Sequence, residues 1–169
     1  MTKQTMLSKN SVIAHDPGIA YQAARLRSAN LQDLNRLEVL YNKARPKSRN
    51  LESRIRAWLE HGGSLYLENQ CGKILSAVCW AEHNGGWRVD RIATLPSERG
   101  QAFGRWLMTK VEALAIRHNI PELSLRLDRK DLLPYYERMG YRVIGKEDHC
   151  NLLQKRVGGT WQIQSDTPS

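Results

Sequence analysis

Residues 99–104 (RGQAFG) form a short stretch of small and basic residues at the start of a long amphipathic run. A helix leaves its first backbone N–H groups unpaired, and its macrodipole makes that end partly positive. Both properties favour a bound phosphate, and Gly100, Ala102 and Gly104 would let it approach the backbone because they carry little or no side chain. Arg99 can add charge at the rim. We interpret these residues as a loop that holds a diphosphate; a tight strand-to-helix turn is the alternative.

Two widespread phosphate loops are absent from the sequence. A P-loop requires the pattern GxxxxGK[ST], and the dinucleotide-binding fingerprint requires GxGxxG. Neither pattern occurs at residues 99–104. A phosphate site here would therefore be of another kind.

The elements before this loop can be predicted from the spacing of apolar residues. The first strand is expected over residues 21–27. A capping box at Asn30 and Asp33 predicts the start of a helix, and a second helix over residues 51–61 should end at the glycines that follow it. A strand is then expected over residues 64–68.

The next two predicted strands are long. The strand over residues 73–83 should pair with its predecessor as a hairpin, and another follows over 87–95. The apolar residues of this strand change from odd to even positions between Val89 and Ile92. A β-bulge produces such a slip, and bulges often lie near functional sites.

After the loop, an apolar stripe predicts a long helix that begins near residue 103. Residues 123–128 alternate apolar and polar side chains, as a strand does. A short helix over 132–140 and a terminal hairpin of strands 141–145 and 151–157 complete the order. Because helices separate only some of the strands, we expect an α/β sheet with parallel and antiparallel pairs.

The composition predicts one globular domain. The chain has 169 residues, of which 41% are apolar, and this length can bury a sizeable core. No apolar stretch approaches the roughly 20 residues of a membrane span, and the N-terminus lacks the apolar segment of a secretory signal. Three cysteines without a close pair suggest neither a metal knuckle nor a redox dithiol. We therefore expect a cytoplasmic protein without a metal site or a membrane partner.

The ends of the chain are expected to differ from the middle. Residues 1–20 show no period and end in Asp-Pro-Gly, which predicts a loose leader. Residues 158–169 read as a polar tail. Residues 21–157 would form the domain between them.

The chain is basic, with a formal net charge of +9. This balance favours anionic partners such as nucleotide phosphates or nucleic acid, and solubility alone is the alternative. The charge is concentrated over residues 43–56, where Glu52 stands among six basic residues. Aromatic residues are sparse there, so stacking of single-stranded bases is not indicated.

Residues 92–108 (IATLPSERGQAFGRWLM) resemble the acetyl-CoA-binding motif of the GNAT superfamily of N-acetyltransferases. That motif runs from a strand through Val-x-Pro-x-x and [Arg/Gln]-x-x-[Gly/Ala]-x-[Gly/Ala] into a helix. The corresponding residues are Thr94 in place of the valine, Pro96, Arg99, Ala102 and Gly104.

A second segment, residues 132–141 (LLPYYERMGY), resembles the family's Phe-Tyr-x-x-x-Gly-Phe segment. Tyr135 and Tyr136 stand for Phe-Tyr, and Gly140 and Tyr141 for Gly-Phe. The resemblance covers roughly residues 22–157. It implies a mixed, mostly antiparallel sheet of about seven strands with four helices, in which strands 87–95 and 123–128 splay apart around the thioester.

The resemblance also implies acetyl-CoA as cosubstrate and assigns the residues that would bind it. Backbone groups of Ile92, Ala93 and Thr94 would contact the pantetheine arm and the acetyl carbonyl. The loop residues that would bind the pyrophosphate are Arg99, Gly100, Gln101, Ala102, Phe103 and Gly104, with Arg105 adjacent.

The reaction implied is direct attack of a primary amine on the acetyl thioester in a ternary complex. Tyr136 matches the tyrosine that protonates the leaving thiolate as general acid. The base stays open among Asp90, Glu82, His83 and water. Arg129 stands where many relatives carry an asparagine seven residues before the tyrosine.

The acceptor cleft of this family would be bordered here by the basic connection at residues 43–50 (KARPKSRN). A cationic rim disfavours polyamines and suits an amine on an anionic scaffold, such as an amino acid, an acidic peptide N-terminus, a nucleotide-like molecule or an aminoacyl-tRNA. Some GNAT toxins acetylate aminoacyl-tRNA, so such a toxin is a further alternative. A solvated loop without specific contacts is the alternative. A catalytically silent module that binds CoA or nucleic acid is the rival function, and the edges of the terminal hairpin would permit a homodimer.

Overall fold

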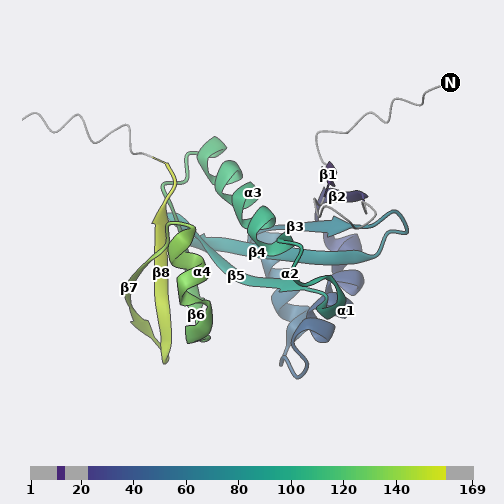
Figure 1. Cartoon of the computed structure of the whole chain (residues 1–169), viewed down its shortest axis with the longest axis horizontal. Coiled ribbons are helices and arrows are strands. Elements are labelled where there is room, and N and C mark those ends of the chain that lie inside the picture. Colours follow the sequence, from purple (N-terminus) through teal and green to yellow (C-terminus); the bar gives the residue numbers. More distant parts are fainter. Residues whose placement is uncertain (1–10, 14–22, 159–169) are drawn as a thin grey trace, which may run out of the picture.

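The computed structural model describes residues 11–13 and 23–158 of the chain (Figure 1). Of the leader predicted over residues 1–20, only 11–13 are described, and they form a short strand that the sequence did not predict. The predicted tail, 158–169, lies outside the described residues apart from Gly158. The limits of the predicted domain, 21–157, therefore stay a prediction.

The described residues contain eight strands and four α-helices, and apart from β1 their order is the one expected from the apolar spacing. The strands are β1 (Ser11–Ile13), β2 (Ala23–Ser28), β3 (Gly62–Glu68), β4 (Ile74–His83), β5 (Gly86–Thr94), β6 (Glu122–Leu127), β7 (Arg142–Glu147) and β8 (Cys150–Arg156). The helices are α1 (Leu34–Ala44), α2 (Leu51–His61), α3 (Phe103–Arg117) and α4 (Leu133–Arg138).

All strands form one sheet in the order β1-β2-β3-β4-β5-β6-β8-β7. Only β5 and β6 are parallel, and the other neighbours are antiparallel. Helices α1 and α2 pack on one face and α3 on the other (Figure 1). The mixed sheet, mostly antiparallel, confirms the predicted fold class, with β1 as an addition at one edge.

The core lies between the helices and the middle of the sheet. Strand β4 is buried along most of its length because helices cover both of its faces. Cys79 is fully buried in this core as a free thiol. Other fully buried side chains include Leu37, Leu67, Val78, Leu107, Val111 and Leu123.

The capping box that the sequence predicted opens a short 3-10 turn, Leu31–Asp33, which leads directly into α1. The Asn30 side chain accepts a hydrogen bond from the Gln32 N–H, and Asp33 accepts one from the Asn30 N–H, both at 2.9 Å. Asp33 also binds Arg36 at 2.8 Å, and Arg36 reaches Glu68 of β3 at 3.1 Å. These ion pairs attach α1 to the sheet.

The bulge predicted in the strand over residues 87–95 is confirmed in β5. Cys79 lies opposite Arg91, whereas the next residue, Trp80, lies opposite Val89. Asp90 is therefore the extra residue of the bulged strand. The bulge lies one residue beyond the last pairing of β5 with β6.

No helix in residues 11–13 and 23–158 is both long and apolar enough to cross a membrane.

Candidate active site

Strands β5 and β6 separate in the middle of the sheet. They pair only where residues 87–89 lie opposite residues 123–125. Beyond Val89, β5 continues to Thr94 and remains paired with β4 alone, while β6 stays with β8. The sheet therefore splays as the resemblance implied, and two cavities open along the gap.

The larger cavity has a volume of about 560 Å³ and lies between the end of β5, the start of α3 and α4. It is lined by Ala44, Arg45, Ile92, Ala93, Thr94, Glu98, Arg99, Gly100, Ala102, Phe103, Gly104, Arg105, Arg129, Leu132, Tyr135 and Tyr136.

The smaller cavity, about 110 Å³, lies between the separated strands, and its lining includes Asp90, Arg91 and Asp128. Arg45, Ile92, Leu132 and Tyr136 line both cavities.

The loop at residues 99–104 opens the start of α3 toward the larger cavity. Ala102 adopts a left-handed backbone conformation, with φ 59° and ψ 23°, and no side chain caps the helix. The first N–H groups of α3 are consequently free of helical partners. Gly100 also has a positive φ, 89°, which glycine adopts without strain.

Not every loop residue contributes equally. A Cβ at Gly104 would meet the Ile92 side chain at 3.5 Å, an ordinary contact, so alanine would also fit there. The Gln101 side chain instead donates to Glu98 at 2.6 Å and does not line the cavity. Among the expected cofactor contacts of the loop, Gln101 is therefore the exception.

The end of β5 lines the cavity with the three residues that the resemblance indicated. The Ala93 carbonyl accepts a hydrogen bond from the Ser76 hydroxyl at 3.0 Å, and the Thr94 hydroxyl lies 2.8 Å from the Ser76 hydroxyl oxygen. Ile92 lines both cavities. Ser76 thus fixes the strand from the β4 side and leaves its other edge open.

Tyr136 lies in the wall shared by the two cavities. Its ring packs edge-on against the rings of Tyr135 and Tyr141, with ring centres 5.1 Å and 5.9 Å apart, respectively. Burial, together with the neighbouring Tyr135, raises the pKa of Tyr136 to about 12, although the Arg45 charge opposes the shift. The phenol therefore keeps its proton at neutral pH and can donate it.

The structure separates the three side chains considered as base. Asp90 lines the smaller cavity together with Tyr136, and its carboxylate accepts a hydrogen bond of 2.7 Å from the Trp58 indole. Glu82 lines a different cavity, of about 640 Å³, beside Trp80 and Trp87.

His83 lies at the far end of β4, opposite Gly86, and lines neither of the two cavities at the splay. Only Asp90 of the three is brought to Tyr136. Glu82 and His83 lie at the end of β4, opposite the first residues of β5 and away from the splay.

Two cationic side chains complete the larger cavity. Arg129, in the position of the family's asparagine, lines it and pairs with Asp131 at 2.7 Å. Arg45 comes from the connection between α1 and α2 and pairs with Asp128 at 3.8 Å. The resemblance implied that the connection at residues 43–50 borders the acceptor cleft, but it did not indicate that Arg45 would also line this larger cavity.

Within the described residues, no group of three or more His, Cys, Asp and Glu side chains could hold a metal ion.

A family model described as an acetyltransferase (GNAT) domain matches residues 60–143. This chain belongs to the GNAT acetyltransferase family. The matched segment contains β5, the loop, α3, β6 and α4, so it includes every element around the larger cavity except the α1–α2 connection.

Solved GNAT structures share the fold. The ribosomal-protein-S18-alanine N-acetyltransferase from Escherichia coli superposes with a TM-score of 0.70 at 14% identity, over 80% of this chain and 95% of that one. The PaiA N-acetyltransferase from Thermoplasma acidophilum, in complex with coenzyme A, gives 0.65 at 14% identity, over 79% and 98%.

The GNAT family N-acetyltransferase YhbS from Escherichia coli, in complex with CoA, gives 0.68 at 14% identity, over 85% of this chain and 86% of that one. At this identity the likeness establishes the fold. No curated protein sequence matches the chain.

Proposed function

We propose that this GNAT chain transfers the acetyl group of acetyl-CoA to a primary amine by direct attack in a ternary complex. The observation that carries the proposal is the position of Tyr136. It lines both the larger cavity, next to the loop, and the smaller cavity, next to Asp90. A donor in one cavity and an acceptor in the other would meet at this side chain.

The larger cavity suits coenzyme A in size and chemistry. Its volume of about 560 Å³ lies within the range of ligand pockets, roughly 300–1,000 Å³. The uncapped start of α3 supplies N–H donors for the pyrophosphate, and Arg99 and Arg105 add positive charge at that end. The open edge of β5 at residues 92–94 supplies backbone groups for the pantetheine arm.

Acetyl-CoA, when bound, supplies an acetyl group activated as a thioester. Asp90 would take a proton from the ammonium of the acceptor, so that the neutral amine nitrogen forms the new bond to the acetyl carbon. The C–S bond would break in the same process, and the Tyr136 hydroxyl would give its proton to the leaving sulfur. The second proton of the amine nitrogen would be released as the amide forms and would restore the Tyr136 hydroxyl through solvent. Trp58 would hold the Asp90 carboxylate in place through its indole N–H.

Titration calorimetry with acetyl-CoA and with CoA, followed by thiol release in the presence of a panel of primary amines, tests the proposal. Micromolar binding of both cofactor forms and amine-dependent thiol release are expected. Absence of cofactor binding would reject the diphosphate interpretation of residues 99–104. Binding without transfer to any amine would favour the catalytically silent module instead.

A further inference from the structure

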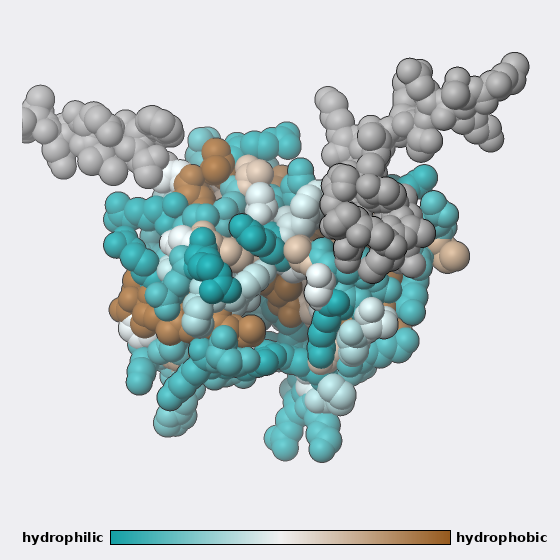
Figure 2. Space-filling view, in the orientation of Figure 1, coloured by the Kyte–Doolittle hydropathy of each residue, from teal (hydrophilic) through white to brown (hydrophobic). Residues whose placement is uncertain are grey.

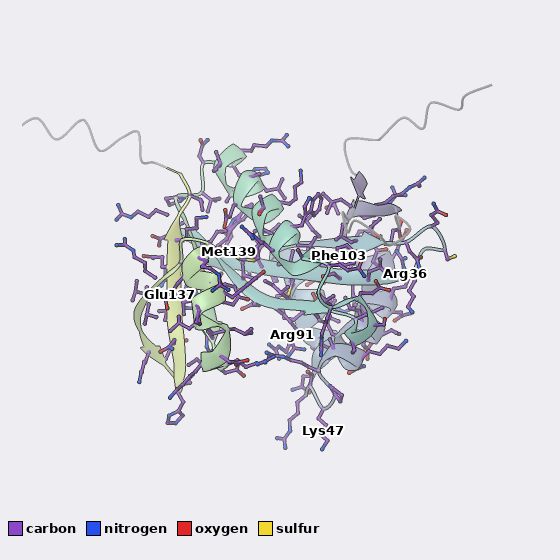
Figure 3. All side chains as sticks on the ribbon, in the orientation of Figure 1. Arg36, Lys47, Arg91, Phe103, Glu137 and Met139 are labelled. Atoms are coloured by element: carbon purple, nitrogen blue, oxygen red, sulfur yellow. The ribbon has the colours of Figure 1, made fainter. Side chains whose placement is uncertain are left out.

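Arg91 is a half-buried cation without an acidic partner. It extends from β5 beneath the α1–α2 connection, whose exposed tip carries Lys47 (Figure 3). One guanidinium N–H donates to the Ser48 hydroxyl at 2.9 Å, and the group lies 5.8 Å from the centre of the Tyr41 ring. Within residues 23–158, no carboxylate oxygen lies within ion-pair distance of it. An arginine has five N–H donors, so most of its binding capacity is unused.

Two further arginines lie close enough to act on Arg91. Burial is the main cause that lowers the pKa of Arg91, and the charges of Arg54 and Arg45 lower it further. Arg54 stacks over the Trp58 ring at 5.5 Å, so the indole that binds Asp90 also supports this arginine. Clustered like charges at a partly desolvated position destabilise a folded chain.

The acidic residues of the smaller cavity do not neutralise this cluster. Asp90 is engaged by Trp58, and Asp128 lies 3.8 Å from Arg45 with most of its side chain exposed. Arg126, the remaining cation of the lining, pairs with Glu147 and Asp148. An anion brought by a ligand would supply the missing counter-charge.

We propose that Arg91, assisted by Arg45 and Arg54, binds a carboxylate or phosphate carried by the acceptor, and that the acceptors are small anionic amines. The inference rests on the proposed acetyl transfer. A planar guanidinium binds either oxyanion through two parallel hydrogen bonds. Because Arg91, Asp90 and Tyr136 line one cavity, an anion at Arg91 places a nearby amine beside the base and the acid.

The size of the cavity limits the acceptor. Its volume of about 110 Å³ is about a fifth of the larger cavity's volume of about 560 Å³. We therefore expect only a few bonds between the amine and the anion of the acceptor. The surface around the connection is hydrophilic (Figure 2), and its cations would repel polyamines.

Matched pairs of amines test this subsite: glycine against glycinamide for the carboxylate, and phosphoethanolamine against ethanolamine for the phosphate. Each is titrated into the CoA-saturated full-length chain by calorimetry, and each is assayed with acetyl-CoA. The anionic member of at least one pair should bind and react about 10- to 100-fold better than its partner. The pair that responds identifies the anion.

Variants assign the effect to Arg91. Arg91→Met should remove the preference, and Arg91→Lys should keep part of it because the charge remains but the fork is lost. Arg56→Met is the control, since Arg56 lies on α2, pairs with Glu52 and lines neither cavity. It should keep the full preference.

The outcomes separate this inference from the proposed function. Acetyl transfer without a preference for anions, or an equal effect of Arg91→Met and Arg56→Met, would overturn the subsite and leave the transfer intact. Binding of an anionic amine that depends on Arg91, without transfer, would support the subsite and reject the transfer. Failure of both anionic probes to bind would overturn the subsite.

Discussion

The indole N–H of Trp58 donates a hydrogen bond of 2.7 Å to the carboxylate of Asp90. Trp58 belongs to α2, and Asp90 is the extra residue of the bulge in β5. The bulge turns a side chain out of the regular alternation just where β5 leaves β6, and α2 then fixes its orientation. The proposed base is thus held by two elements that meet only in the folded chain.

Replacing Asp90 by asparagine should lower kcat/KM about 10²- to 10⁴-fold at neutral pH, the usual contribution of a positioned base. The difference in kcat/KM between Asp90→Asn and the parent chain should become smaller as the pH rises, because the amine then deprotonates without assistance. Glu82→Gln, on β4 opposite Trp87 and away from the splay, discriminates between the two carboxylates considered. An equal loss in both variants, or none in Asp90→Asn, would reject Asp90 as the base.

Tyr136→Phe should lower kcat by about 10²- to 10⁴-fold while the affinity for CoA stays unchanged. The buried ring is retained and only the proton donor is lost. Tyr141→Phe is the control, because Tyr141 is a neighbouring buried ring that lines neither cavity. This change removes the hydroxyl that donates a hydrogen bond of 3.3 Å to Glu112. Turnover should survive that change. Similar kcat values in the two variants would show that Tyr136 is not the general acid.

The raised pKa of Tyr136 also predicts how stability depends on pH. In the folded chain burial raises it to about 12, whereas an unperturbed tyrosine titrates near about 10. Between these values the unfolded chain releases the proton first, so stability falls as the pH rises, by up to about 2–3 kcal/mol. Denaturant unfolding at about pH 9 and about pH 11 should show a smaller loss in Tyr136→Phe than in the parent chain. Equal losses would contradict a perturbed phenol.

Local signals predicted much of the fold. The capping box at Asn30 and Asp33, the helix end at His61 and the slip between Val89 and Ile92 each depend on neighbouring residues, and each is present in the structure. Such features are decided within a few residues of the chain. The family's motifs are local in the same way, and they are the basis for predicting the loop and Tyr136 as site residues.

Contacts between distant segments could not be predicted in this way. Spacing left Asp90, Glu82 and His83 as equal candidates, because the residue that distinguishes Asp90 lies 32 positions away on α2. Arg45 lines both cavities only because the α1–α2 connection lies next to the splay. The insertion of β8 between β6 and β7 is likewise a property of the whole sheet.

Arg36→Met should destabilise the chain by about 2–3 kcal/mol at neutral pH, less than a fully buried pair because 40% of the Arg36 side chain is exposed. Burial raises the pKa of Asp33, but hydrogen bonds from Arg36, the Asn30 N–H and Tyr66 outweigh it and leave the pKa lowered. A lowered pKa contributes stability above the unfolded value and loses it as the pH falls.

The difference between Arg36→Met and the parent chain should consequently shrink in acid. Arg27→Met is the matched change, since among the described residues Arg27 forms an ion pair only with Glu68, and its side chain is 47% exposed. It should cost less than about 1 kcal/mol. Denaturant unfolding at neutral and acidic pH measures both, and an Arg36 effect that is equal at the two pH values would contradict the ion-pair explanation.

Ala102→Gly should stabilise the chain, because alanine is strained at φ 59°. The left-handed conformation costs an L-residue about 1–2 kcal/mol, of which the greater freedom of glycine in the unfolded chain offsets about 0.5–1 kcal/mol. Ala113→Gly makes the same change at an exposed position inside α3. It should destabilise by about 1 kcal/mol, since glycine is unfavourable in a helix. The change in melting temperature should therefore have opposite signs in the two variants.

CoA affinity should persist in Ala102→Gly, because the proposed contacts use backbone N–H groups that the substitution retains. A destabilised Ala102→Gly would mean that the turn at the start of α3 does not hold this backbone conformation.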